Sequence, residues 1–561
     1  MNNNNESSGA DIPRGGVSRR SFVAQSSLML AGSALGGRRL LAFTRNSRGN
    51  RRSLATVVVS PFPPEVLRSV AKTAIDVAVQ AGAEWADIRL GEERRLYVLG
   101  DSGEVRLLCG YSLRVRVRGA EAFVTGSDPT VAAVTKAARS AVATAKSLIS
   151  ARRSVPADSL AKVPVVTGEW RVPMKIDPFA ISIDDHVAAT ISGDGQFDRF
   201  LIRYQRQEGI APGIYSQWRQ GTRVFASSEG SLTTQLLTSV NPHPGMLKFG
   251  AWRAQRGEPF GLSGLSMIAP SSGGFELITH PDRFAQMQAR VEELRRYLAL
   301  PAVPLDIGRQ DVVLDGTLHG QLVGAIVVPA LSLNRALGNE IDVAGTSMFA
   351  PPESMRGQAV LPALLNCDVT PQAPNYGAAA WDEEGVASTS FPLVTNGVLT
   401  NYLSSRTTFP FQGANPGPLG GVTQSQLGAL PTELPPSVTV APDAHGGSMA
   451  ELAKQMGNGI LALGGGVATD PSGLGGYIYP EMMLEVRQGV VTRRTFGHRL
   501  MYSSRRVFKT LTALGDATTK NTAFCQKYSP GVPWVGLDHT VTAPAALYRN
   551  IDIVPHYMEA S

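Results

Sequence analysis

The 561-residue chain lacks a long apolar run and has few cysteines. No segment reaches about 18 uninterrupted apolar residues, so nothing in the sequence is typical of a membrane-spanning helix. The three cysteines, Cys109, Cys367 and Cys525, are far apart and cannot form a disulfide framework. At least one of them must stay unpaired within the chain, and a lone cysteine is most often a small core residue.

Two common catalytic motifs are also absent. The glycine-rich stretches "FQGANPGPLGGVTQSQLG" and "LGGGVATDPSGLGG" do not contain the GxxxxGK[ST] pattern of a phosphate-binding loop. No GxSxG nucleophile elbow occurs anywhere in the chain. The sequence therefore gives no support for a P-loop nucleotidase or an α/β-hydrolase, and the glycine-rich stretches are interpreted as surface turns or lids.

The chain has no net charge outside its first 52 residues. That leader carries nine arginines and two acidic residues, which together account for the formal charge of +7. The remaining residues comprise 44 basic and 44 acidic side chains. A basic leader on a neutral body does not form a phosphate-binding surface, so the composition argues against nucleic acid as a partner.

The leader contains an arginine pair directly before a short apolar run. Arg19 and Arg20 lie in "SRRSF", and the modestly apolar run extends over residues 22–37. This arrangement is typical of a twin-arginine export signal, which carries folded proteins across the bacterial inner membrane. We therefore expect a periplasmic or other extracytoplasmic location and an encounter with the twin-arginine translocase. A disordered basic tail is the alternative, and the cleavage site stays open between residues 34–36 and 53–55.

Hydrophobic periodicity after the leader predicts an α+β protein. Residues 56–160 combine two amphipathic helices with period-two strands such as "YSLRVRVRG", which indicates an N-terminal α/β domain. Residues 161–308 contain a proline-bearing linker and a middle section of strands and helices. From residue 309 to 561 the pattern changes to short strands and glycine-rich loops, which predicts a larger strand-rich C-terminal domain.

A series of short phrases occurs in order along the chain. They are "GAEWADIRL", "EWRVPMKIDPFAISIDD", "VFASSEGSLTTQ", "DVVLDGTLHGQLVG", "LNRALGNEIDVAGTSMF", "WDEEGVASTSFPLVTNGVLTNYL", "ALGD" and "TAFCQK". In this order, over residues 65–555, they resemble the TldD/PmbA family, the peptidases named as modulators of DNA gyrase, and together they are much more specific than any one alone. The resemblance implies the two-domain α+β fold of that family.

The resemblance also implies a zinc peptidase with an HExxxH motif and a cysteine as a further ligand. Such a site holds zinc with two imidazoles and a thiolate, and the glutamate accepts a proton from the bound water. Anchored on "LNRALG", the motif falls on Gly324, Ala325, Ile326, Val327, Val328 and Pro329, and a one-residue shift gives 323–328. Neither register contains a histidine or a carboxylate, so only the cysteine remains, as Cys525.

Other residues were considered as replacement ligands. His319 precedes the degenerate motif by five positions, and an alternative zinc site would join it to Cys525 and a third group. The candidates for that third group are Glu340, Asp342, His498 and His539. Separately, the adjacent acids Asp382, Glu383 and Glu384 in "WDEEG" form either a titrating pair on a strand or, more simply, a solvated strand end.

Two classes of function follow from these residues. The first is a non-catalytic member without a cofactor, a peptide-binding or assembly subunit that forms a homodimer or a heterodimer with a relative. The second is a working zinc peptidase that cleaves unstructured peptides with relocated ligands. A role in nucleic-acid regulation, which the family's older name suggests, fits poorly with export and a neutral body.

Overall fold

The computed structural model describes most of the chain after the leader. Its described residues are 62–99, 102–149, 160–186, 210–213, 215–241, 246–249, 269–279, short stretches between 289 and 300, 301–341, 345–412, 417–423, 427–470, 473–496, 498–529 and 532–555. The Arg19–Arg20 pair lies outside these residues. None of the helices in the described part combines the length and the apolarity needed to cross a bilayer.

The first sheet joins strands from two sections that the sequence suggested were separate. Its strand order is β3-β2-β1-β6-β7-β4, with β9 paired to β7. The expected boundary near residue 160 therefore falls between strands of one sheet. The strands are β1 (Trp85–Leu99), β2 (Ser102–Val117), β3 (Ala120–Gly126), β4 (Thr167–Arg171), β6 (Tyr215–Ser227), β7 (Leu232–Asn241) and β9 (Ser271–Ser272).

The two faces of this sheet differ in chemistry because strand side chains alternate. On β1, Ile88 and Leu90 pack with the helices α2 (Pro64–Gln80) and α3 (Val131–Leu148) in one apolar core. Asp87 and Arg89 point to the opposite face, where they are also buried. The second face is therefore charged and yet covered by the rest of the protein.

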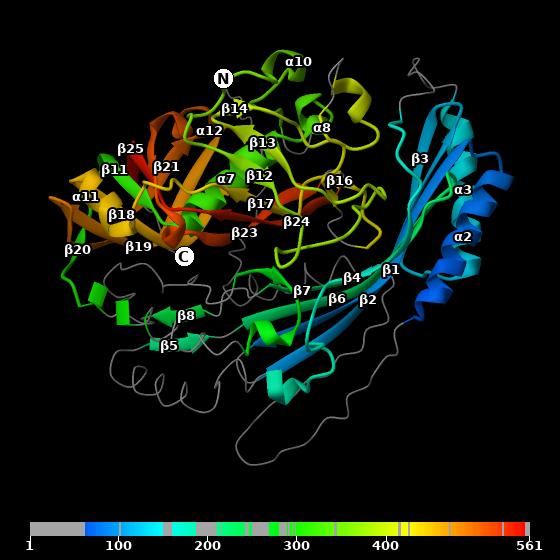
Figure 1. The fold of residues 1–561 in the computed structure, drawn as a ribbon, viewed down its shortest axis with the longest axis horizontal. Coiled ribbons are helices and arrows are strands. Elements are labelled where there is room, and N and C mark those ends of the chain that lie inside the picture. Colours follow the sequence, from blue (N-terminus) through cyan, green and yellow to red (C-terminus); the bar gives the residue numbers. More distant parts are fainter. Residues whose placement is uncertain are drawn as a thin grey trace, which may run out of the picture. The chain divides into compact units, whose positions relative to one another are not determined.

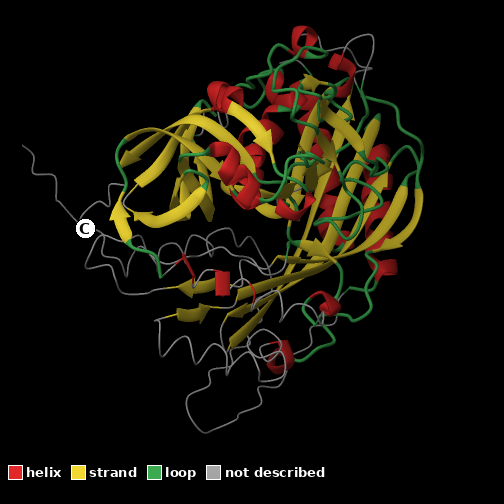
Figure 2. Ribbon diagram, turned by 60° about the vertical axis from the view of Figure 1, so that its left-hand side comes forward, coloured by secondary structure: helices red, strands yellow, loops and turns green. Residues whose placement is uncertain are grey.

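The C-terminal part is built around two further sheets, and the described chain is strand-rich throughout (Figure 2). One sheet has the order β10-β20-β19-β18-β11-β25-β21, and β22 also pairs with β25. Its strands are β10 (Ala302–Pro304), β11 (Gly308–Leu314), β18 (Gly459–Thr469), β19 (Gly475–Arg487), β20 (Val490–Phe496), β21 (His498–Ser503), β22 (Leu511–Leu514) and β25 (Ala546–Pro555).

The other large C-terminal sheet has the order β14-β13-β12-β17-β24-β23. Its strands are β12 (Cys367–Val369), β13 (Phe391–Thr395), β14 (Val398–Leu399), β17 (Ser437–Val440), β23 (Asn521–Ser529) and β24 (Val532–Ala543). Two short two-stranded sheets complete the strands of the described residues. They pair β5 (Ile210–Gly213) with β8 (Met246–Phe249), and β15 (Val422–Thr423) with β16 (Thr432–Glu433).

Helix α7 (Gly316–Ala330) packs in the main C-terminal core, against β18 of one sheet and β23 and β24 of the other (Figure 1). The shorter helices are α8 (Leu333–Ala336), α10 (Pro352–Met355), α11 (Met449–Met456) and α12 (Ser504–Val507). The α+β class expected from the sequence is confirmed.

Candidate functional site

Helix α7 carries the degenerate motif and lies unusually close to β23 and β24. Asp315 caps its first turn by accepting a hydrogen bond from the backbone N–H of Leu318 at 2.9 Å. Gly316, Gly320 and Gly324 recur every four residues and so share one face of the helix. A Cβ atom on any of them would meet atoms of β23 or β24 at 3.0 Å or less. The glycines are therefore needed for this close helix-to-sheet approach.

Gly324, where the resemblance places the first motif histidine, directly faces Cys525 in the structure. A Cβ atom built on Gly324 would lie 2.4 Å from Cys525 Sγ and 3.0 Å from Cys525 Cβ. The sequence-based register thus brings the two positions of the family's ligand set together. The space between them is filled by the thiol, so no imidazole fits there without displacing the helix or the strand.

The remaining motif positions belong to the core. Ile326, Val327 and Val328 are at most 5 % exposed, and Ala325 packs beside them. Pro329 lies in the last turn of α7, and the helix ends one residue later at Ala330. The helix thus continues through Pro329, which lacks a backbone N–H and cannot donate an intrahelical hydrogen bond.

Cys525 and the two nearby histidines are buried in uncharged forms. Burial raises the pKa of the Cys525 thiol to about 12, so in the absence of a metal it is protonated. Burial lowers the pKa of His319 and of His539 to about 4, against the opposing effect of their hydrogen bonds. These bonds join His319 Nδ1 to the Pro544 carbonyl at 2.8 Å and His539 Nε2 to the Gly324 carbonyl at 3.2 Å.

The described residues do not fit a zinc ion. Among them, no group of three His, Cys, Asp or Glu side chains converges as a ligand set. Glu340 forms a buried ion pair with Lys527 at 2.8 Å. His498 Nδ1, in β21, lies 2.8 Å from the carbonyl of Phe496 at the end of β20. Asp342 lies outside the described residues. A catalytic zinc needs three protein ligands at one point. Here Cys525 and its cross-strand partner His539 meet at Gly324, and no third potential ligand joins them among the described residues.

The acidic phrase "WDEEG" is not a solvated strand end, and that expectation is wrong. It forms a turn between Trp381 and Ala387, and Glu384 is fully buried. The Asp382 carboxylate accepts hydrogen bonds from the backbone N–H groups of Glu384 and Val386 at 2.8 and 3.0 Å. Burial, followed by repulsion from Glu384, raises the pKa of Asp382 to about 7. Asp382 is thus held by its own turn.

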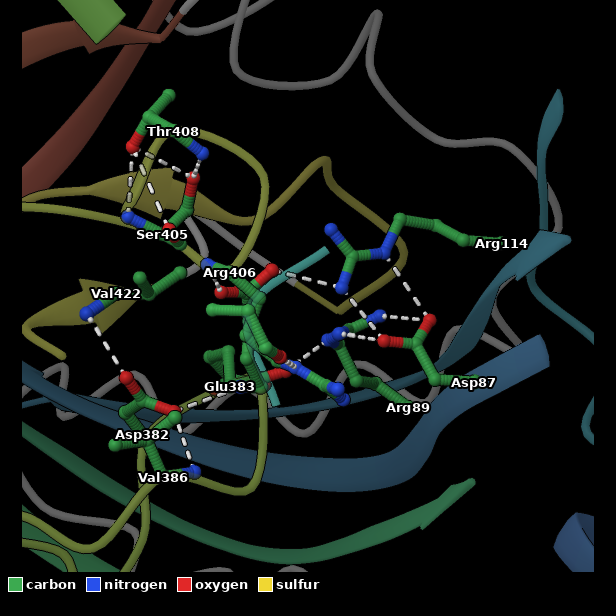
Figure 3. Close-up of polar contacts among 12 residues, drawn as sticks. Asp87, Arg89, Arg114, Asp382, Glu383, Val386, Ser405, Arg406, Thr408 and Val422 are labelled. Atoms are coloured by element: carbon green, nitrogen blue, oxygen red, sulfur yellow. Dashed lines mark hydrogen bonds and ion pairs between the residues drawn. The ribbon is translucent and has the colours of Figure 1, made fainter. Parts of the chain in front are cut away.

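A buried charge cluster links the first sheet to this turn, and Figure 3 shows its Asp87, Arg89 and Arg114 side chains. Glu384 joins the cluster through Arg114. Asp87 accepts hydrogen bonds from both Arg89 and Arg114, with shortest distances of 2.6 Å to each. Arg114 also contacts Glu384 at 2.8 Å, and Arg89 donates to the Glu383 carbonyl. The side chains of Asp87 and Glu384 are fully buried, so this cluster is a structural junction within the fold.

A second arginine fixes the same region. Arg406 donates two hydrogen bonds to the Glu229 carboxylate, at 2.7 and 2.8 Å, and its backbone N–H donates to Glu384 at 2.6 Å. The guanidinium also lies over the Trp85 ring, 5.6 Å from its centroid. These contacts orient the "WDEEG" turn against the charged face of the first sheet.

A cavity of about 140 Å³ lies where β1, β6 and β7 meet the "WDEEG" turn and β24. Arg219 and Arg223 of β6 and Glu93 of β1 line its sheet side, and Asp538 of β24 lines the other side. Sequence reasoning missed this site. The alternation in "SQWRQGTRVF" places Arg219 and Arg223 on one face, but nothing in the sequence indicates that this face lies against another part of the chain.

The cavity and the degenerate motif are on opposite faces of the β23–β24 ribbon. Cys525 and His539 point toward α7, where they contact Gly324. Asp538, the neighbour of His539, points the other way and pairs with Arg219 at 2.7 Å. The cavity is therefore separated from the former ligand positions by two strands.

Comparisons with known proteins give the same family as the sequence phrases. The family model described as "PmbA/TldA metallopeptidase C-terminal domain" matches residues 307–554. A protein named "Metalloprotease" from Methanothermobacter thermautotrophicus is 23% identical over 476 residues, covering 81% of this chain and 93% of that protein.

Two solved structures have a similar fold. TldE from Thermococcus kodakarensis superposes with a TM-score of 0.61 at 13% identity, over 86% of this chain and 100% of that chain. A protein described as a modulator of DNA gyrase from Bacteroides thetaiotaomicron gives a TM-score of 0.57 at 14% identity, over 87% of this chain and 99% of that chain. Residues 307–554 thus match the C-terminal domain of the TldD/PmbA family, and the chain as a whole is similar to TldD/PmbA proteins.

Proposed function

We propose that this protein is an exported, non-catalytic TldD/PmbA-family protein that binds unstructured peptide or serves as an assembly subunit. The observation that carries the proposal is the contact between Gly324 and Cys525. The place of an imidazole is taken by a protonated thiol, and the adjoining motif residues form apolar core. In this proposal the protein forms a homodimer, or a heterodimer with a relative that supplies catalysis.

The zinc content of the mature protein tests the non-catalytic assignment. We expect well under one zinc ion per chain after desalting, because too few ligands converge to hold the metal. Elemental analysis measures this, and incubation of zinc-supplemented protein with an unstructured peptide should leave the peptide uncut. Stoichiometric zinc that disappears in Cys525→Ser or His319→Ala would instead establish a peptidase with relocated ligands.

The export signal is tested by replacing its arginine pair. Arg19→Lys with Arg20→Lys is expected to abolish export, because a twin-arginine signal is read through these two residues. The matched control is Arg38→Lys with Arg39→Lys, an arginine pair that follows the apolar run instead of preceding it. Cell fractionation decides the outcome, and a double mutant at positions 19 and 20 that still crosses the membrane would refute the assignment.

A further inference from the structure

The cavity beside β6 contains an arginine whose hydrogen-bonding capacity is only partly used. Arg223 donates from Nη2 to Glu93 Oε2 at 2.9 Å. Its Nε and Nη1 atoms are buried and have no hydrogen-bond partner among the described residues. Buried guanidinium N–H groups are costly to leave unpaired, so free donors of this kind mark a place for an acceptor.

The other arginines around the cavity are already engaged. Arg219 forms its 2.7 Å ion pair with Asp538. Arg95 donates from Nε to Glu93, which therefore lies between two guanidinium groups. Burial alone would raise the pKa of Glu93, but Arg95, Arg223 and Arg219 together hold it at about 2. The arginines thus make the electrostatic potential at this end of the cavity positive. Among them, Arg223 has N–H groups, at Nε and Nη1, without an acceptor among the described residues.

The opposite wall limits which anion is accepted. Asp382 and Glu383 line the same cavity, and the Asp382 carboxylate is occupied by backbone N–H groups of its own turn. The Glu383 carboxylate adds negative charge to that wall. A dianion such as phosphate would be repelled more strongly there than a singly charged carboxylate. A cavity of about 150 Å³ holds a benzene-sized group, so this one suits a chain end or one side chain and not a folded partner.

We propose that this cavity is a carboxylate-binding site, in which Arg223 receives either the C-terminal carboxylate or an acidic side chain of an unstructured peptide. The proposal rests on the peptide-binding role proposed above and specifies the group that is recognised. Because β23 and β24 separate the cavity from Gly324, recognition does not depend on any metal at the degenerate motif.

Isothermal titration calorimetry with four matched ligands tests the proposal on the mature protein. The ligands are the acetylated peptide Ac-AGSAL as the free acid, the same peptide as its C-terminal amide, the amidated peptide Ac-AGSAE, and inorganic phosphate. We expect the acid to bind at least about tenfold more tightly than the Ac-AGSAL amide, because a charge-assisted hydrogen bond is lost in the amide. Phosphate should bind more weakly than the acid. Tight binding of the amidated Ac-AGSAE would identify a side-chain carboxylate as an equally good source.

Two variants of Arg223 assign the effect to this residue. Arg223→Gln should remove the difference in affinity between the Ac-AGSAL acid and its amide. Arg223→Lys, which keeps the charge and a partner for Glu93, should reduce the difference while retaining the fold. The matched control is Arg106→Gln on β2 of the same sheet, whose guanidinium pairs with Glu104 away from the cavity. This control should bind all ligands as the wild type does.

The outcomes separate the two proposals. Equal affinity for the acid and both amides, or equal effects of Arg223→Gln and Arg106→Gln, would overturn the carboxylate site and leave peptide binding intact. Phosphate binding tighter than that of the acid would overturn the choice of carboxylate. If none of the peptides binds, the peptide-binding role and the carboxylate site both fail.

Discussion

Replacing Asp87 with alanine is expected to lower the free energy of unfolding by about 3–5 kcal/mol, the usual result of breaking a buried ion pair from one side. Asp87 is fully buried and accepts four hydrogen bonds, two each from Arg89 and Arg114. Without it, two adjacent buried guanidinium groups would share only Glu384 and the Glu383 carbonyl as acceptors. Urea denaturation followed by circular dichroism measures the change.

The matched control for Asp87 is Asp552→Ala. Asp552 also pairs with an arginine, Arg309, but their side chains are 42% and 69% exposed, and surface pairs contribute about 0–1 kcal/mol. The pH dependence adds a second check. Burial would raise the pKa of Asp87, but Arg114 and Arg89 hold it well below its usual range. Its stabilisation is therefore present above about pH 4 and is lost as the pH falls further. If wild type and Asp87→Ala differ in free energy of unfolding by the same amount at pH 7 and at pH 3, the stabilisation does not come from the ionised Asp87 carboxylate.

Restoring the motif with Gly324→His, Ala325→Glu and Pro329→His is expected to destabilise the protein without restoring zinc. The first new side chain begins where Cys525 Sγ already lies, 2.4 Å from a Cβ atom. Over-packing costs about 1–3 kcal/mol per site. The free energy of zinc binding, on the order of 10 kcal/mol, would offset this loss of stability only if the three ligands already had the geometry that zinc requires. Thermal denaturation and elemental analysis measure the two effects.

A simpler pair of substitutions isolates the crowding at α7. Gly324→Ala should lower the free energy of unfolding by about 1–3 kcal/mol. The loss should be smaller in a Cys525→Ala background, because the side chains at positions 324 and 525 compete for one space. Gly466→Ala is the control, since the Cβ atom added there would have Gln321 Oε1 as its nearest neighbour, at 3.8 Å.

The opposite outcome for the restored motif is also clear. A Gly324→His, Ala325→Glu, Pro329→His triple mutant that folds well, binds one zinc ion and cleaves unstructured peptides would show that only the ligands were lost and that the cleft is intact.

The absence of histidine and carboxylate side chains from residues 323–329 is evident from the sequence alone. The buried helix α7 that carries these residues, and continues through Pro329, is a finding of the structure. The register also paired Gly324 with Cys525, although these residues are far apart in the chain. That pairing came from the family resemblance, since periodicity carries no information on which strand covers a helix.

The charged face of the first sheet was not predictable for a physical reason. The period-two pattern of "SLRVRVRG" separates Leu113 and Val115 from Arg114 and Arg116, and both apolar and charged faces exist as expected. A charged face is ordinarily exposed to water. Here Arg114 is buried because Asp87 and Glu384 neutralise it, and Glu384 comes from a turn that the sequence does not place nearby. The Arg223 cavity was missed for the same reason.

The strand β11 illustrates how this fold depends on a pairing between segments far apart in the sequence. β11 lies between β18 and β25, and Gly308 at its start pairs with Ile553 of β25. During synthesis, one hydrogen-bonding edge of β11 therefore stays unpaired until β25 (Ala546–Pro555) has been made. Such long-range pairings form slowly and leave sheet edges open to wrong partners in the meantime. A ribosome that stalls before Ala546 would release a chain whose largest C-terminal sheet cannot close, however complete its first half is.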